Sequence, residues 1–469
     1  MIQTTETITA TIRADKEGSI SELLADLLHG HKKTAEHQRQ LWNRYMLKDV
    51  PIMNRKQVAY EKVNRKIAND FYGDIVDTKV GYMGNEVSVS LDRGSYEGSG
   101  QFDIDRGVVH EFSTFNSTED LNSDLLRDAA TVGIGYRLLY VRDGQNEVRM
   151  KNLVPWEVIY IYDQSIDEPQ LVLRYYELED TADYSVTYTV VEWYDDREVR
   201  YYIDDGNYNF RLDPARGEVQ SHLFTGVPII PFLNNRDMLA EPEKVTGLID
   251  AYDAILSSTA SEFEQLRMAY MYAKGAGLQV DKEFINNLEQ TGVFALPEDG
   301  DVGFISKEVA AEAVKLILDE IRKNIYQFAK SIDMSKDFGG DMRVIGWQVA
   351  LLNLENSSKI TERKFQKSLS RQYDLITNYW SRFKGVNIDP SNLEFVFTRN
   401  FPRDLYSEAQ TLEILTSQVS KKTAFGLMSF IDDPDAEIDR LDEEQVYDPF
   451  RMVPDANTRP TYEQPQDME

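Results

Sequence analysis

The sequence contains no cysteine, and it has only five histidines among 469 residues. The absence of cysteine excludes disulfide bonds, thiolate nucleophiles and cysteine-ligated zinc. No run of apolar residues approaches the ~18 that a transmembrane helix needs, and the polar first residues contain no apolar signal core. We therefore expect a soluble protein that is made and kept in a reducing cytoplasm and does not enter a membrane.

Positive charge is also scarce in this chain. It has 51 basic residues against 80 acidic ones, which gives a formal net charge of −29. Such a balance repels nucleic acid and anionic membranes at long range. Hydrophobic residues make up 42% and aromatic residues 11%, so the chain can bury a large core, and disorder is excluded for most of it. The length predicts roughly three domains.

The common catalytic motifs are missing as well. Neither G-x-S-x-G nor H-E-x-x-H occurs, and no serine has a plausible histidine partner. His29 and His31 are two residues apart on a predicted helix, so they face different directions and do not form a shared metal site. We therefore expect no catalytic residues, no metal and no cofactor.

Residues 334–350, MSKDFGGDMRVIGWQVA, combine three glycines with two cations. This composition suggests a phosphate-binding loop, but the spacing excludes a Walker loop, which follows a strand and ends in Gly-Lys-Ser/Thr. Here a helix is predicted before the loop, and Gly346 is followed by tryptophan and glutamine. ATP binding is therefore not expected.

Two acidic groups are candidates for metal binding. Asp103 and Asp105 in FDIDRG resemble a D-x-D metal pair, although alternate positions on a strand edge produce the same pattern. The second group has the oxygen ligands that a hard cation prefers, but it lacks the glycine of a calcium loop, and a helix N-terminus also favours acids. Its members are Asp432, Asp433, Asp435 and Glu437. We favour a structural explanation for both groups and keep a metal-dependent carbohydrate- or nucleotide-active enzyme using Asp103 and Asp105 as an alternative.

Periodicity divides the chain into helical regions around a β module. Apolar residues at helical spacing predict helices over 19–44, 57–80 and 120–131. From 134 to about 225, alternating apolar and β-branched residues between turn signals predict a largely antiparallel β module. Residues 161–220 contain fifteen acidic and five basic residues, so one face of this sheet is expected to lie in water.

The second half is dominated by long helices. Apolar stripes predict helices from 242 to 270, from 307 to 328 and from 347 to 383, with a glycine-rich insert between the first two. A strand-like run at 392–402 and shorter helices over about 404–445 follow. Between 321 and 384 there are twelve basic and six acidic residues, a local net charge of +6 in an acidic chain.

Four stretches, taken in order, resemble the portal proteins of tailed bacteriophages, specifically those of the siphophage type. The most specific one places a helix with an early asparagine before a Gly-Tyr-x-Gly turn and a strand. The stretches are HKKTAEHQRQLWNRYMLKDVPI (31–52), NRKIANDFYGDIVDTKVGYMGNEVSVSL (64–91), GVPIIPFLNN with EKVTGLIDAYDAILSSTASEFEQL (226–235 and 243–266), and SQVSKKTAFGLMSFIDDPDAEIDRLDEE (417–444).

The resemblance implies an α+β portal fold whose parts follow the predicted segments. One part is a stem of two helices, which are expected at 241–272 and 307–331. The remaining parts are an N-terminal arm (1–19), a wing of helices and antiparallel strands (20–240), a small α/β clip (273–306), a tunnel loop (332–346), a spine helix with a strand returning to the wing (347–403), a crown (404–445) and a mobile acidic tail (446–469).

The resemblance also implies a function, a location and partners. Portal proteins form a ring, usually a dodecamer, at one vertex of the virion capsid, and double-stranded DNA passes through its channel during packaging and ejection. The implied partners are other copies of the chain, the terminase large subunit, head-completion or adaptor proteins, and the major capsid and scaffolding proteins. Assembly in the host cytoplasm is expected, and another head–tail connector protein is a second alternative.

The resemblance implies that the loop at 332–346 faces the DNA. Its cations would touch phosphates without reading bases, and its glycines would let it change shape as DNA moves past. Because each cation that neutralises a phosphate strengthens binding, an acidic channel with few cations would keep DNA mobile. The residues assigned to this surface are Lys336, Arg343, Lys330, Gly339, Gly340 and Gly346.

Overall fold

The structure is a computed structural model, and its described residues fall into two compact units. The first comprises Met1–Gly340 with Gln348–Asn400, and the second comprises Asp341–Trp347 with Phe401–Glu469. The described residues are 17–57, 63–83, 86–96, 99–162, 169–179, 187–204, 208–266, 270–274, 282, 286, 300–305, 311–334, 351–400, 405–428, 431, 434, 437–438 and 440–442.

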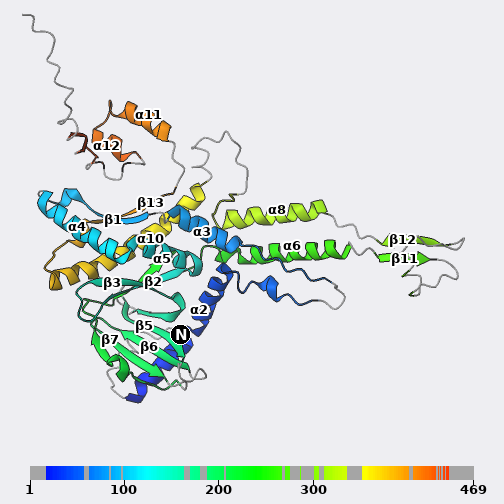
Figure 1. Ribbon diagram of the computed structural model, residues 1–469, viewed down its shortest axis with the longest axis horizontal. Coiled ribbons are helices and arrows are strands. Elements are labelled where there is room, and N and C mark those ends of the chain that lie inside the picture. The colour runs from blue at the N-terminus through cyan, green and yellow to red at the C-terminus, as the bar shows by residue number, and fades with distance from the viewer. Residues whose placement is uncertain are drawn as a thin grey trace, which may run out of the picture. The chain divides into compact units, whose positions relative to one another are not determined.

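The first unit combines long helices with antiparallel sheets (Figure 1). Its α-helices are α2 (Glu17–Tyr45), α3 (Phe71–Met83), α4 (Ser99–Asn116), α5 (Thr118–Val132), α6 (Thr246–Leu266), α8 (Ala311–Phe328) and α10 (Leu352–Phe383). Its 3-10 helices are η1 (Pro51–Asn54), η2 (Arg93–Ser95), η3 (Pro155–Glu157), η4 (Pro214–Arg216), η5 (Glu243–Val245) and η6 (Pro390–Asn392).

The β module predicted from residue 134 onward is confirmed, and it consists of two antiparallel sheets. A three-stranded sheet has the order β10 (Ile229–Leu233), β2 (Ile134–Val141), β3 (Val148–Leu153). A six-stranded sheet contains β4 (Val158–Tyr162), β5 (Pro169–Glu179), β6 (Thr187–Tyr194), β7 (Glu198–Asp204), β8 (Phe210–Leu212) and β9 (Val219–Ser221), with β8 and β9 both paired to β7. The chain is therefore an α+β protein.

Two further sheets join segments outside this module. β1 (Glu86–Leu91) pairs with β13 (Leu393–Thr398), which comes about 300 residues later in the chain and follows α10. β11 (Tyr270–Lys274) pairs with β12 (Asp301–Ile305) beyond the ends of α6 and α8. Side chains alternate between the two faces of a strand, so Val87 and Leu91 lie on the same face of β1, and both are buried. This buried face accounts for the pairing of β1 with β13.

The main core forms around α10. Apolar and aromatic residues at helical spacing along this helix are buried, and they pack with residues of α3, α5, β2 and β10. Tyr373, Tyr379 and Trp380 are each at most 1% exposed. Aromatic rings supply large contact areas in such a core. The predicted long helix is confirmed from residue 352, while its expected start at 347–350 lies outside the described residues.

Gly133 is needed where α5 ends and β2 begins. Its φ of 92° lies in the left-handed region that favours glycine. A Cβ atom there would lie 1.9 Å from the carbonyl oxygen of Met238, so any other residue would force the connection after β10 to move. The Gly133 carbonyl also accepts a hydrogen bond from the Asn234 amide at 3.0 Å. This turn therefore fixes the position of Asn234.

The helix predicted over 57–80 is partly wrong. Helix α3 begins at Phe71, and residues 63–70 are irregular. Their backbone is held by side chains of α6: the amides of Arg65, Ile67 and Asn69 donate to Ser261 Oγ, Ser257 Oγ and Asp253 Oδ1 at 2.9, 3.0 and 3.1 Å. Hydrogen bonds to a distant helix thus replace the internal ones that the local pattern predicted.

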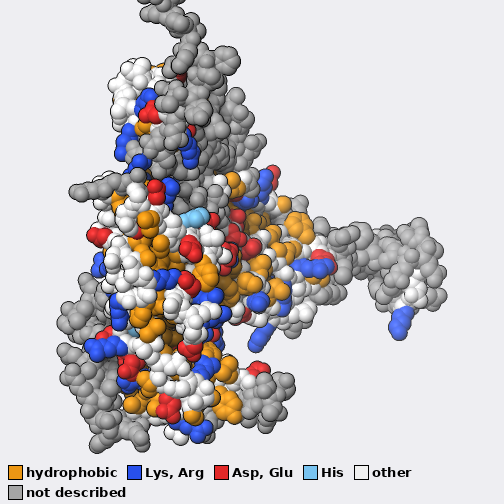
Figure 2. All heavy atoms as spheres, turned by 60° about the vertical axis from the view of Figure 1, so that its left-hand side comes forward, with side chains coloured by type: hydrophobic (Ala, Val, Ile, Leu, Met, Phe, Trp, Pro, Cys, Tyr) orange, Lys and Arg blue, Asp and Glu red, His pale blue; other side chains and the backbone are white. Residues whose placement is uncertain are grey.

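Helices α6 and α8 lie side by side and project as an arm, with the strand pair β11–β12 at its far end (Figure 1). Their apolar stripes face each other only in part. Phe263, Leu316 and Ile317 are 48%, 70% and 50% exposed. Hydrophobic side chains are accordingly visible on the surface of this arm in Figure 2. In the described part of the chain, no helix is long and apolar enough to cross a membrane.

The second unit contains two short described helices, α11 (Leu405–Leu415) and α12 (Lys421–Gly426). Ser420 caps α12, because its hydroxyl accepts a hydrogen bond from the Thr423 amide at 3.3 Å. Ala424, Phe425 and Met428 are buried. Short helices predicted after residue 404 are thus confirmed at these positions.

Candidate functional site

Most of the cationic loop predicted at 332–346 lies outside the described residues. Residues 335–350 are not described, and Lys336, Gly339, Gly340, Arg343 and Gly346 belong to this segment. Their assignment to a DNA-facing surface stays a prediction. The structure does describe both places where the chain enters and leaves the segment.

The entry side begins where α8 ends. Lys330 has a φ of 56°, and its amide donates to the Gln327 carbonyl at 3.3 Å, so the helix closes here. Ile332 and Asp333 are then buried. Asp333 accepts a hydrogen bond from Arg322 Nη2 at 2.9 Å, which forms an ion pair back to α8. The chain is therefore fixed up to Asp333, while the Lys330 side chain stays exposed.

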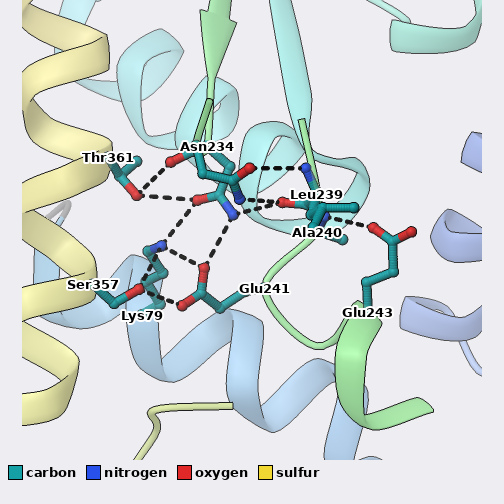
Figure 3. A network of polar contacts seen from close by, with 9 residues as sticks. Lys79, Asn234, Leu239, Ala240, Glu241, Glu243, Ser357 and Thr361 are labelled. Atoms are coloured by element: carbon teal, nitrogen blue, oxygen red, sulfur yellow. Dashed lines mark hydrogen bonds and ion pairs between the residues drawn. The ribbon is translucent and has the colours of Figure 1, made fainter. Parts of the chain in front are cut away.

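The exit side is the first part of α10, and it is held by a buried polar network (Figure 3). Lys79 of α3 donates from Nζ to Asn234 Oδ1 at 2.9 Å and to Glu241 Oε2 at 2.5 Å. Ser357 of α10 donates to Glu241 Oε1 at 2.7 Å, and Thr361 donates to the Asn234 carbonyl at 2.9 Å. Three segments distant in sequence thus meet at one ion pair.

Burial makes this ion pair unusual. The side chains of Lys79 and Glu241 are only 1% and 9% exposed. Burial alone would raise the pKa of Glu241, but the Lys79 charge and the hydrogen bonds from Lys79, Ser357 and Asn234 outweigh it and hold that pKa below its usual value. Burial also lowers the pKa of Lys79, and the Glu241 carboxylate and its hydrogen bond oppose that shift. We interpret the contact as an ion pair from its geometry, since a buried charge persists only where it is paired and hydrogen-bonded.

A cavity of about 150 Å³ adjoins the network and brings its residues next to the end of α8. It is lined by Lys79 and Glu241, by Ser357 and Thr361 of α10, and by Lys330, the predicted site residue that the structure describes. The same cavity is thus bordered by the end of α8 and by the first turns of α10. Sequence reasoning missed Lys79 and Glu241, because no local spacing pattern relates residues that lie 162 positions apart.

The rest of the local positive charge lies on α10. Lys359, Arg363 and Lys367 are exposed and follow each other at intervals of four residues, and Lys364 beside them is half-buried. On a helix this interval places side chains on one face. The excess of cations that the sequence showed between 321 and 384 is therefore partly gathered on one helix face outside the loop.

The structure does not support a metal pair at Asp103 and Asp105. The strand-edge expectation is wrong, because both residues belong to helix α4, where a spacing of two directs them to different faces. Asp105 is buried and accepts hydrogen bonds from Tyr96 Oη at 3.0 Å and Gln101 Nε2 at 2.7 Å, whereas Asp103 is exposed and lies 3.5 Å from Arg106.

The second acidic group cannot be assembled from the described residues. Asp432, Asp433 and Asp435 lie outside them, and Glu437 is paired with Arg440 at 3.1 Å. Among the residues that the structure describes, no group of three or more His, Cys, Asp and Glu side chains could hold a metal ion. His31 instead contacts Tyr175 Oη at 3.0 Å, and burial lowers its pKa to about 4.

Comparisons with known proteins point to one family. The model of the family described as "Phage portal protein, SPP1 Gp6-like" matches residues 25–448. The portal protein of Bacillus phage SPP1 is 25% identical over 401 residues, which cover 82% of this chain and 76% of that protein. The portal protein of Clostridium phage phiCD119 is 23% identical over 398 residues, covering 80% of this chain and 83% of the relative. The chain therefore belongs to the SPP1 Gp6-like family of phage portal proteins.

Proposed function

We propose that this protein assembles into a ring, dodecameric as the resemblance implies, at one vertex of a phage capsid. Double-stranded DNA would pass through the ring during packaging and ejection. The protein would be a structural part of the virion that performs no catalysis itself. A terminase large subunit would supply the ATP-driven motor, and head-completion or adaptor proteins would bind once the head is filled.

The observation that carries this proposal, together with the family match, is the apolar surface of the α6–α8 arm. A pair of helices that projects from the body can bury only the faces that meet each other. Leu316 and Ile317 of α8 and Phe263 of α6 stay 48–70% exposed in a single chain. Contiguous exposed apolar side chains on a soluble protein mark interaction surfaces. Neighbouring copies in a ring would cover them.

We assign parts of the portal to the chain accordingly. The stem would comprise 241–272 and 307–331, with the clip at 273–306 as the docking surface for the terminase and later an adaptor. The wing would comprise 20–240. Residues 347–403 would form the spine helix and the strand that returns to the wing. The crown would comprise 404–445. The tunnel loop at 332–346 would bring Lys336 and Arg343 to the DNA.

The assembly test uses the full chain. We expect purified protein to form rings with an axial channel in electron micrographs and to lack ATPase activity. A protein that stays monomeric and shows metal-dependent activity would contradict the proposal and favour an enzyme. Rings that assemble onto a preformed portal, but do not support packaging themselves, would favour a different head–tail connector.

The loop assignment is tested separately. The variant Lys336→Ala/Arg343→Ala should form intact rings but impair DNA packaging or retention, because two phosphate contacts per subunit are lost. The matched control is Lys32→Ala/Lys33→Ala, which removes two exposed cations from α2. Unchanged packaging and retention in intact rings of the loop variant would refute the assignment of Lys336 and Arg343.

A further inference from the structure

Helix α10 carries a row of cations on its exposed face. Lys359, Arg363 and Lys367 are all exposed. Residues at intervals of four share one face of a helix and are separated by about 6 Å along its axis, so the row is about 12 Å long. Lys364 lies half-buried beside it. We call Lys359, Arg363 and Lys367 the cationic row.

The carboxylates closest in sequence neutralise this row only at its first member, Lys359, which forms an ion pair with Glu355. Arg399 donates from Nε to Glu355 at 2.8 Å and from Nη2 to Glu362 at 2.5 Å. Both glutamates are thereby engaged by a cation that lies outside α10. Lys359 retains a longer contact of 3.4 Å to Glu355, in which its side chain is 58% exposed. Within the described ranges, no carboxylate lies within ion-pair distance of Arg363 or Lys367.

A row in which only Lys359 has a carboxylate partner needs an explanation in an acidic chain. Like charges at intervals of four destabilise a helix. The sequence has 80 acidic residues, so carboxylates for pairing are abundant, yet the fold directs the nearest two to Arg399. An anionic partner would offset the repulsion along the row.

The chemistry of the row indicates a particular partner. Between residues 359 and 367, Ile360 is the large hydrophobic side chain that is strongly exposed, at 45%. Protein interfaces usually have an apolar centre with aromatic residues, and single-stranded nucleic acid is bound through aromatic stacking. Evenly spaced lysine and arginine side chains instead suit the phosphates of a duplex, which they contact without reading bases.

We propose that Lys359, Arg363 and Lys367 form a second DNA-contacting surface, which binds the phosphate backbone of double-stranded DNA independently of its sequence. The inference rests on the proposed function as a DNA conduit, and it adds a surface on α10 to the tunnel loop. Three contacts per subunit give weak, salt-sensitive binding, because each neutralised phosphate changes the slope of log K against log salt by about 0.9. Such contacts allow DNA to slide.

The test compares two triple variants of the full chain. Lys359→Gln/Arg363→Gln/Lys367→Gln removes the row, and the matched control Lys32→Gln/Lys33→Gln/Lys48→Gln removes three exposed cations from α2 and the turn that follows it. Affinity for a double-stranded DNA fragment is measured by fluorescence anisotropy between roughly 50 and 200 mM salt. The row variant should bind at least about tenfold more weakly at low salt and show a shallower salt slope, while the control stays within about twofold of the original chain.

A charge-preserving variant, Lys359→Arg/Arg363→Lys/Lys367→Arg, should retain both affinity and slope. Equal affinity and slope in the row variant and the original chain would overturn the inference. The inference would also be overturned if the row variant formed fewer rings and those rings bound DNA normally. In that case the row would contact another copy of the chain. Ring formation by the original chain is scored separately in micrographs, so failure of the proposed function is recognised independently. Affinities are compared between samples in the same oligomeric state, so a weaker affinity of the row variant supports the inference and an unchanged affinity contradicts it.

Discussion

At the scale of single residues, the buried pair of Lys79 and Glu241 is the most consequential feature of the structure. It joins α3, the connection after β10 and, through Ser357, helix α10. Removing one partner of a buried ion pair leaves an uncompensated charge, which is far more costly than removing both. The pair therefore holds the first turns of α10, the exit side of the proposed tunnel loop, against the body of the protein.

We expect Lys79→Met to lower the free energy of unfolding by about 3–5 kcal/mol, because Glu241 is left buried without its cation. The measurement is the urea midpoint of the full chain, followed by the fluorescence of the tryptophans, of which Trp380 lies in the main core.

The double variant Lys79→Met/Glu241→Leu is the control for this prediction. It should recover most of the loss, since apolar residues of similar size often replace a buried pair without penalty. A single variant as stable as the original chain, or a double variant as unstable as the single one, would show that the two side chains are not energetically coupled.

At the scale of secondary-structure elements, local pattern and tertiary contact decide different things. Amphipathic periodicity predicted α2, α5 and α10 closely, because these helices bury one face against a core, and it also predicted α8, which packs against α6. It failed for residues 63–70, where Ser257, Ser261 and Asp253 of α6 bind the backbone. It also did not indicate α4, where the pattern at Asp103 left a metal pair and a strand edge open. For residues 63–70 the partner that decides the conformation is distant in sequence, and for α4 the local pattern is ambiguous.

Helix α8 gives the prediction at this scale. The variant Leu316→Asp/Ile317→Asp should abolish ring assembly, because each aspartate would bring an unpaired charge into an apolar interface between neighbouring stems. The stability of the single chain should change little, since both side chains are largely exposed in it. Analytical ultracentrifugation measures the fraction of assembled chain.

The control carries the same change in charge at two exposed helical sites, Thr34→Asp/Gln40→Asp in α2. It should assemble normally. Rings that form equally well with the two aspartates in α8 would show that this face of the arm is not an interface between copies.

At the scale of the whole molecule, charge limits how copies associate. Each chain carries a formal net charge of −29, so neighbouring copies repel each other through water. The range of this repulsion is about 30 Å at 0.01 M salt and about 8 Å at 0.15 M. The proposed ring must overcome it with apolar contacts such as those of the stem.

Assembly should therefore increase with salt over this range, because screening weakens the repulsion and leaves apolar contacts unaffected. Sedimentation at a fixed protein concentration measures the assembled fraction at each ionic strength. The opposite trend, with rings falling apart as salt rises, would show that opposite charges across the interface dominate its stability. DNA binding by the cationic row should weaken over the same range, which separates the two effects.

Several properties of this protein were determined by the sequence alone. The lack of cysteine, the strong acidity, the β module and the order of the helices follow from composition and periodicity, which are local, and the ordered motifs were sufficient to indicate the portal family. For the candidate site, the sequence predicted where positive charge is concentrated and named Lys330, which the structure places at the cavity beside Lys79.

Only the tertiary structure decided which charges meet. Lys79 and Glu241 are paired although they lie 162 residues apart, and no spacing rule connects them. The cationic row on α10 is available to an anionic partner because Arg399, brought back by the strand β13, binds Glu355 and Glu362. The physical reason is that periodicity specifies which face of an element is buried, whereas the pairing of a charge depends on which distant segment folds against it.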